Sequence, residues 1–96
     1  MNNEITCIAQ FTAKKEKTEQ LKRSLTALIE PTRNEPGCLS YSLHQNTENE
    51  NMFTMIERFK DKEAFDFHGR QPYLVNFKNS VEELIESVDV NMYERK

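Results

Sequence analysis

The chain has 96 residues, of which 30% are charged and 36% are hydrophobic, and its formal net charge at pH 7 is −3. This length predicts one domain over residues 1–96 and excludes a catalytic cleft between two domains. The acidic balance lacks the basic surface of a nucleic-acid-binding protein, so no nucleic-acid partner is expected. No apolar run approaches the roughly 20 residues of a membrane span, and the N-terminus shows no signal pattern, so we expect a cytoplasmic protein without a membrane partner.

The first third of the chain predicts a strand followed by a helix. Apolar and polar side chains alternate over residues 5–11, which is the period-two pattern of a strand. From about residue 12 to residue 35 the period becomes helical, with an apolar stripe at Leu21, Leu25, Leu28 and Ile29. Pro36 and Gly37 should end this helix, because proline keeps the preceding residue extended and glycine permits a positive φ.

The middle of the chain predicts two strands joined by a hairpin. In the first, Leu39, Tyr41 and Leu43 alternate with polar residues and should share one face. A wholly polar loop covers residues 46–51. In the next strand, the side chains on one face are Phe53, Met55, Glu57 and Phe59.

The last third predicts a broken helix and a closing strand. Asp61 is a suitable N-cap for a short helix over 62–68, and Pro72 can open a second helix. Apolar residues keep helical spacing from Leu74 to Val88, and residues 88–93 then alternate. The order β-α-β-β-α-β is that of an α+β, ferredoxin-like domain. Right-handed crossovers place its first and third strands at the centre of a four-stranded antiparallel sheet, with the helices on one face.

Glu57 breaks the apolar pattern of its strand face and should point at the helices. Burial there would raise its pKa unless a cation or hydrogen-bond donors paired with it. Two interpretations stay open: a structural carboxylate bonded to a helix N-terminus, Arg33 or Arg70, or a member of a functional site. Cys7 and Ala9 on the neighbouring strand are small, which leaves room for a ligand or for phenylalanine packing.

His68 is the second candidate functional residue. It ends the short helix, where an imidazole can cap the helix C-terminus or serve as a base in a pocket. His44 lies on the more polar face of its strand and is expected at an edge or interface. Tyr41 shares an apolar face, so it is a core residue, a pocket wall or both, and its hydroxyl needs a partner.

Several other kinds of site lack support in the sequence. Cys7 and Cys38 have neither metal-ligand spacing nor a disulfide framework, and we expect buried thiols. The two histidines form no metal signature, so no metal site is predicted. With two glycines in the chain there is no glycine-rich phosphate loop, and no nucleophile elbow is present.

Two segments resemble the antibiotic biosynthesis monooxygenase domain family. Residues 32–41, TRNEPGCLSY, are similar to its R-x-E-P-G-C-x-x-Y stretch. Residues 57–68, ERFKDKEAFDFH, are similar to its E-x-W/F-x-D-x-x-A-x-x-x-H stretch, and Pro72 falls where that family often has proline. The resemblance implies a ferredoxin-like fold whose sheets pair across a homodimer into a dimeric α+β barrel.

The resemblance also implies a chemistry. Characterised members include oxygenases of quinols and polyphenols that need no cofactor, haem-degrading enzymes, and an isomerase of a small sugar phosphate. The first class implies a small aromatic substrate, O₂, His68 as base and Glu57 as its orienting or proton-relaying partner. The residues expected to bind the substrate are Tyr41, Phe59, Tyr73, Ala9 and Arg33.

The alternatives to an oxygenase differ in what they require. Haem degradation is disfavoured, because Phe59 stands where the haem-degrading relatives have tryptophan and the chain has no tryptophan. An isomerase of a small phosphorylated metabolite would use Arg33, Arg70 or a lysine to bind the anionic group. A non-catalytic binding or stress-response module on the same scaffold would bind aromatics without turnover.

Overall fold

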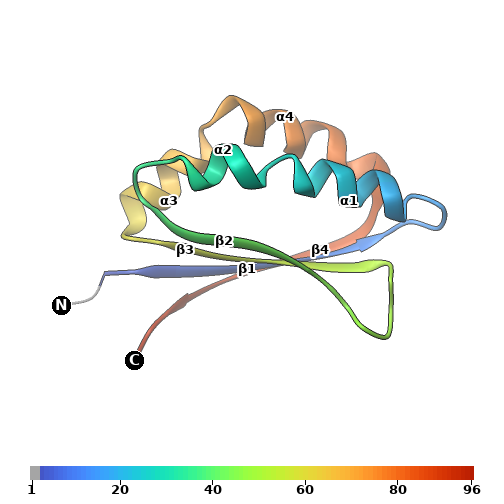
Figure 1. The fold of residues 1–96 in the computed structure, drawn as a ribbon, viewed down its shortest axis with the longest axis horizontal. Coiled ribbons are helices and arrows are strands. Elements are labelled where there is room, and N and C mark those ends of the chain that lie inside the picture. Colours follow the sequence, from blue (N-terminus) through green and yellow to red (C-terminus); the bar gives the residue numbers. More distant parts are fainter. Residues whose placement is uncertain (1–2) are drawn as a thin grey trace.

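The computed structural model describes residues 3–96, which form one antiparallel sheet with a layer of helices on one face (Figure 1). The strands are β1 (Ile5–Ala13), β2 (Cys38–Gln45), β3 (Met52–Phe59) and β4 (Ile85–Glu94). The helices are α1 (Thr18–Thr26), α2 (Ile29–Arg33), α3 (Lys62–Gly69), α4 (Pro72–Val81) and the single 3₁₀ turn η1 (Glu82–Leu84). The strand order β2-β3-β1-β4 confirms the ferredoxin-like arrangement, with β1 and β3 at the centre.

The core lies between the sheet and the helices. In the β1–β3 register Phe11 pairs with Phe53 and Ala9 with Met55, and these side chains all point at the helix layer. Leu21 on α1 is fully buried against them. Burial of a leucine or phenylalanine side chain contributes about 1.5–3 kcal/mol, so this period-two face supplies much of the stability of the domain.

The expected single helix over 12–35 is wrong in two respects. First, β1 continues to Ala13, and a turn with Glu16 at φ 68° separates the strand from α1. Second, the helix is interrupted between Thr26 and Ile29. Pro31 explains the interruption, because proline has no N–H to donate to the carbonyl four residues earlier and its ring clashes there. Within α2, Pro31 occupies the first turn, where the missing N–H is tolerated.

The expected helix from Leu74 to Val88 is also too long. Helix α4 ends at Val81, and β4 begins at Ile85 rather than at Val88. The Lys14 N–H donates to the Leu84 carbonyl at 2.9 Å, so the chain is already joined to the end of β1 at this point. Ile85 and Val88 are three residues apart, which fits the apolar stripe of a helix. Both are also β-branched, which favours a strand, so the sequence pattern here fitted both structures.

The turn into β2 corrects two further expectations. A register shift between Cys38 and Ser40 places Leu39 outside the regular pairing, where it is 50% exposed instead of sharing the face of Tyr41. Gly37 does not adopt a positive φ. Its small size is needed instead, because a Cβ on Gly37 would lie 2.2 Å from the Cβ of Ala64 on α3.

The starts of the last two helices agree with the sequence. Asp61 caps α3, where its Oδ1 accepts a hydrogen bond from the Ala64 N–H at 2.8 Å. Pro72 lies in the first turn of α4. Within residues 3–96, no helix has both the length and the apolar character that crossing a bilayer requires.

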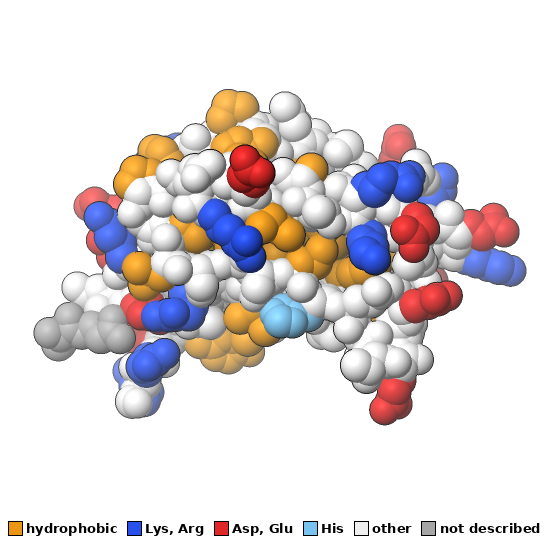
Figure 2. Space-filling view, viewed as in Figure 1, with side chains coloured by type: hydrophobic (Ala, Val, Ile, Leu, Met, Phe, Trp, Pro, Cys, Tyr) orange, Lys and Arg blue, Asp and Glu red, His pale blue; other side chains and the backbone are white. Residues whose placement is uncertain are grey.

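The helix layer leaves β4 uncovered. Val88, Val90 and Met92 pair with Phe11, Ala9 and Cys7, so they point to the helix side of the sheet, yet each is about half exposed. Elsewhere hydrophobic side chains also reach the surface between the charged ones (Figure 2). The uncovered side of β4 leaves an opening between this strand and the helices.

Candidate active site

Glu57 lies on the helix-facing side of β3, two residues before the end of the strand, and the residue is 6% exposed. The strand registers place Cys7 of β1 and Tyr41 of β2 directly beside it. Burial first, and then the charge of Glu35, raise the pKa of Glu57 from 4.5 to about 8, and the charge of Lys78 acts in the opposite direction. Glu57 therefore holds a proton over most of the neutral range.

His68 lies in the last turn of α3 and points down at the sheet, where it is 3% exposed. Its Nε2 lies 3.8 Å from Oε1 of Glu57, which is too long for a hydrogen bond and leaves the two groups in electrostatic contact. Three aromatic rings surround the imidazole: Phe59 at 5.0 Å, Tyr41 at 5.6 Å and Phe65 at 6.4 Å between centroids. These rings fix the orientation of the imidazole.

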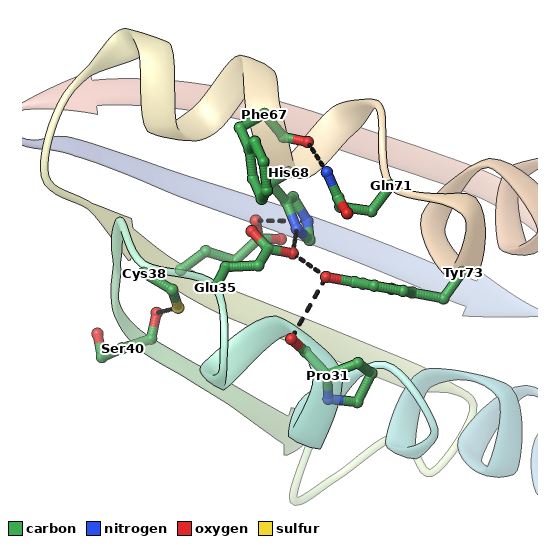
Figure 3. A network of polar contacts seen from close by, with 9 residues as sticks. Pro31, Glu35, Cys38, Ser40, Phe67, His68, Gln71 and Tyr73 are labelled. Carbon is green, nitrogen blue, oxygen red and sulfur yellow. Dashed lines mark hydrogen bonds and ion pairs between the residues drawn. The ribbon is translucent and has the colours of Figure 1, made fainter.

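Glu35 holds the other side of the imidazole (Figure 3). Its Oε2 lies 2.9 Å from Nδ1 of His68, and the Tyr73 hydroxyl donates to the same oxygen. A carboxylate oxygen that already accepts from a phenol accepts a second hydrogen from Nδ1, so the neutral imidazole keeps its lone pair on Nε2, toward Glu57. Among the described residues 3–96, Oε1 of Glu35 is buried without a hydrogen-bond partner, which leaves its charge poorly solvated.

Glu35, His68 and Glu57 form a buried array, the Glu35–His68–Glu57 array. A cavity of about 700 Å³ extends from this array between the sheet and the helices. His68, Glu57, Tyr41 and Ala9 line it, so four of the seven predicted site residues share one space. Most of its wall is apolar and includes Leu25, Leu28, Phe77, Val81, Val88 and Val90. The volume and the mainly apolar wall with a limited number of polar groups are typical of a small-molecule site.

The other three predicted site residues lie around the cavity rather than on its wall. Phe59 is fully buried against the His68 ring, and Tyr73 supports Glu35. Arg33 is turned to β2, where its Nε donates to the Tyr41 carbonyl at 3.0 Å beside a separate hollow of about 370 Å³. Within the described chain neither Arg33 nor Arg70 forms an ion pair with Glu57, so the expectation that one of these arginines pairs with Glu57 is wrong.

The thiols and the second histidine take no part in the array. Burial raises the pKa of Cys7 to about 12 and that of Cys38 to about 11, so both thiols are protonated near neutral pH. Cys7 is buried and Cys38 only partly so. His44 is exposed on β2, with its Nε2 2.9 Å from the Ser42 hydroxyl, as expected for a residue of the sheet edge.

Glu35 is the functional candidate that the residue pattern did not single out. It follows the apolar stripe of the first helix and precedes Pro36-Gly37, a position that ordinarily lies on the surface of a turn. Its burial depends on α3, which is 33 residues away along the chain and brings His68 over the turn. The sequence signal for Glu35 was its place in the Glu-Pro-Gly part of residues 32–41, the segment that resembles the family.

Comparison with known proteins identifies the family. The family model described as antibiotic biosynthesis monooxygenase matches residues 4–80. The chain is 32% identical over 85 residues to Rv0793 of Mycobacterium tuberculosis, provisionally named a monooxygenase, covering 88% of this chain and 83% of that protein. It is 32% identical over 81 residues to the uncharacterised protein sll1783 of Synechocystis, covering 83% of this chain but spanning only 55% of that protein.

Solved structures agree with this assignment. The crystal structure of PA3566 from Pseudomonas aeruginosa superposes with a TM-score of 0.95 at 35% identity, covering 100% of this chain and 97% of that one. The structure of Rv0793 gives a TM-score of 0.93 at 30% identity, covering 97% and 95%. The chain therefore belongs to the antibiotic biosynthesis monooxygenase family.

Proposed function

We propose that this protein is an oxygenase of electron-rich aromatic substrates of the quinol or polyphenol class, that it uses O₂ and requires no cofactor, and that His68 is its base. The observation that carries the proposal is the buried Glu35–His68–Glu57 array at one end of a largely apolar cavity. An aromatic ring suits the apolar walls, and a ring hydroxyl would be the group that meets the array.

The first step is removal of a proton from the bound phenol. The lone pair of His68 Nε2 accepts that proton, and the Glu35 carboxylate stabilises the imidazolium that results. We therefore assign the orientation of His68 to Glu35, which contacts Nδ1, and not to Glu57 as expected from the sequence. Glu57, protonated below its pKa of about 8, remains the neighbouring acid at 3.8 Å from Nε2, where a substrate hydroxyl or a water between the two would relay a proton.

The second step joins the ionised substrate to O₂. The phenolate transfers electrons to O₂, a carbon–oxygen bond forms at a ring carbon that bears hydrogen, and the proton held by His68 converts the peroxide to a hydroperoxide. Loss of water from this hydroperoxide, which takes the hydrogen of that carbon, leaves a quinone carbonyl, so one oxygen atom enters the product and the other leaves as water. The substrate supplies all the electrons. The mainly apolar wall of the cavity favours this route because it offers little of the hydration that would stabilise the phenolate.

The alternatives have less support from the site. For a phosphorylated metabolite, the cavity offers Lys78 and Arg70, but the rest of its wall is mainly apolar and Arg33 faces a different hollow. A binding module would not need a buried imidazole between a carboxylate and a protonated carboxyl group, which is an arrangement suited to moving protons. An isomerase would retain its activity without O₂, whereas the proposed oxygenase would lose it.

A homodimer is part of this proposal. Strand β4 is exposed on both sides, with Val88, Val90 and Met92 toward the helix side and Tyr93 toward the other. Exposed Ile56 adds an apolar residue to the open face of the sheet. A partner would cover these side chains. Size-exclusion chromatography with light scattering should give twice the chain mass of 11.4 kDa, and a monomer at micromolar concentration would contradict the dimer.

The test is oxygen consumption by metal-stripped protein with a panel of reduced naphthoquinones and polyphenols. We expect uptake above autoxidation that falls by about 100-fold or more in His68→Ala, which is the usual contribution of a general base. His44→Ala is the matched control and should retain full activity, because His44 is exposed on the sheet edge.

Added imidazole distinguishes a lost base from a damaged fold. It should partly restore turnover in His68→Ala if the cavity left by the side chain admits it. Uptake that is unchanged in His68→Ala would show that His68 is not the base. Absence of uptake across the panel with wild-type protein would count against the oxygenase itself.

A further inference from the structure

Lys78 brings a positive charge to the cavity wall, and the proposed proton transfer by the Glu35–His68–Glu57 array gives this charge no role. It lies on α4 between Phe77 and Val81 and lines the cavity together with Glu57 and Cys7 of the sheet. Its charge lowers the pKa of both groups, although burial outweighs this effect, so the ammonium acts on the same end of the cavity as the array. Among residues 3–96, Lys78 forms no ion pair with a carboxylate.

The other charged residues on the cavity wall do not replace it. Asp66 forms an ion pair with Lys62 at 3.2 Å, and Arg70 and Glu82 are exposed residues of opposite charge. Lys78 is exposed too, but it is the cation whose charge acts on Glu57 and Cys7 at the buried end of the cavity. At the buried end of the cavity, Glu35 carries a negative charge and Glu57 holds a proton. An anion that formed there without a cation would be repelled by Glu35 and poorly solvated by apolar walls.

We infer that Lys78 is the anion-binding residue of this cavity, and that the cavity takes planar aromatic anions: ionised phenols and the more acidic hydroxyquinones. The inference rests on the proposed function in one respect, namely that an aromatic compound occupies the cavity. It adds that the bound aromatic is held as the anion. A hydroxyquinone is ionised at neutral pH because it is a vinylogous acid, so oxygenated products of this class should bind at least as tightly as the parent phenols.

The experiment measures binding and does not depend on turnover. The probes are lawsone, a hydroxynaphthoquinone that is an anion at neutral pH, and its methyl ether, which has the same ring system and no charge. Equilibrium dialysis with absorbance detection gives the dissociation constant of each probe for wild type, Lys78→Met and Lys78→Arg. Lys22→Met is the matched control, because Lys22 is an exposed lysine of α1 outside the cavity wall and its loss changes the net charge equally.

We expect Lys78→Met to weaken lawsone binding by about tenfold, the size of one unit charge acting at short range near a protein surface. The methyl ether should bind Lys78→Met as well as wild type, Lys78→Arg should retain affinity for lawsone, and Lys22→Met should change neither. Equal loss for both probes, or no loss for lawsone, would overturn the inference and leave the oxygenase proposal intact. Failure of both probes to bind wild-type protein would overturn the two together.

Discussion

The raised pKa of Glu57 predicts a stability that falls as pH rises. Its pKa is 4.5 in a free side chain and about 8 in the folded protein. Between these values the folded state keeps a proton that the unfolded state has released, so deprotonation favours unfolding as pH increases. At about 1.36 kcal/mol per pKa unit, the full effect is about 5 kcal/mol, and about 4 kcal/mol of it falls between pH 5 and pH 9.

The Glu57→Gln variant isolates this effect. Glutamine keeps the shape of the side chain and cannot ionise, so the variant should gain about 4 kcal/mol relative to wild type over that pH range. Urea unfolding followed by far-ultraviolet circular dichroism gives the free energy at each pH, and subtraction removes the titration of groups common to both proteins. Glu63→Gln, which alters an exposed carboxylate of α3, should run parallel to wild type. A difference between Glu57→Gln and wild type that stays constant from pH 5 to pH 9 would refute the reasoning.

Two further substitutions test the supports of the array, both by urea unfolding. Gly37→Ala should destabilise by about 2 kcal/mol because its Cβ would overlap α3, whereas Gly69→Ala, whose added Cβ meets nothing within 4 Å, should not destabilise. An equal effect of the two would show that the close contact at Gly37 is unimportant. Tyr73→Phe should lose about 1–2 kcal/mol with the hydrogen bond to Glu35, and exposed Tyr93→Phe should lose nothing. A Tyr73→Phe variant as stable as wild type would mean that the phenol is not needed to hold the carboxylate.

The fold was predictable because its main signals are local. Alternation along β1 and β3 and the leucine stripe of α1 each follow from side-chain direction in a single element. Errors arose where one pattern fitted two structures, as with Ile85 and Val88. The interruption of the first helix had a visible cause in Pro31, but its apolar stripe continues across the break and hid it.

The site was predictable only in part. Glu57 was notable because a carboxylate among apolar residues conflicts with burial, and His68 because imidazole titrates near neutral pH. Glu35 carries no such conflict in its own neighbourhood, since its burial results from packing between segments far apart in the sequence. Arg33 was expected in the pocket for its charge, but its direction depends on the backbone of β2, which it binds.

The contact between Gly37 and Ala64 has a consequence for how the array responds to a ligand. Glu35 lies two residues before this contact and His68 one helical turn after it, so the approach of two backbones sets the spacing of the acid and the imidazole. The Lys60 N–H donates to the Gly37 carbonyl at 2.9 Å and so stabilises the turn that precedes β2. The reorganisation energy of the pair on binding should therefore be small. The β4 wall of the cavity lies on a separate part of the sheet, so evolution can alter which compounds enter without disturbing the spacing of Glu35 and His68.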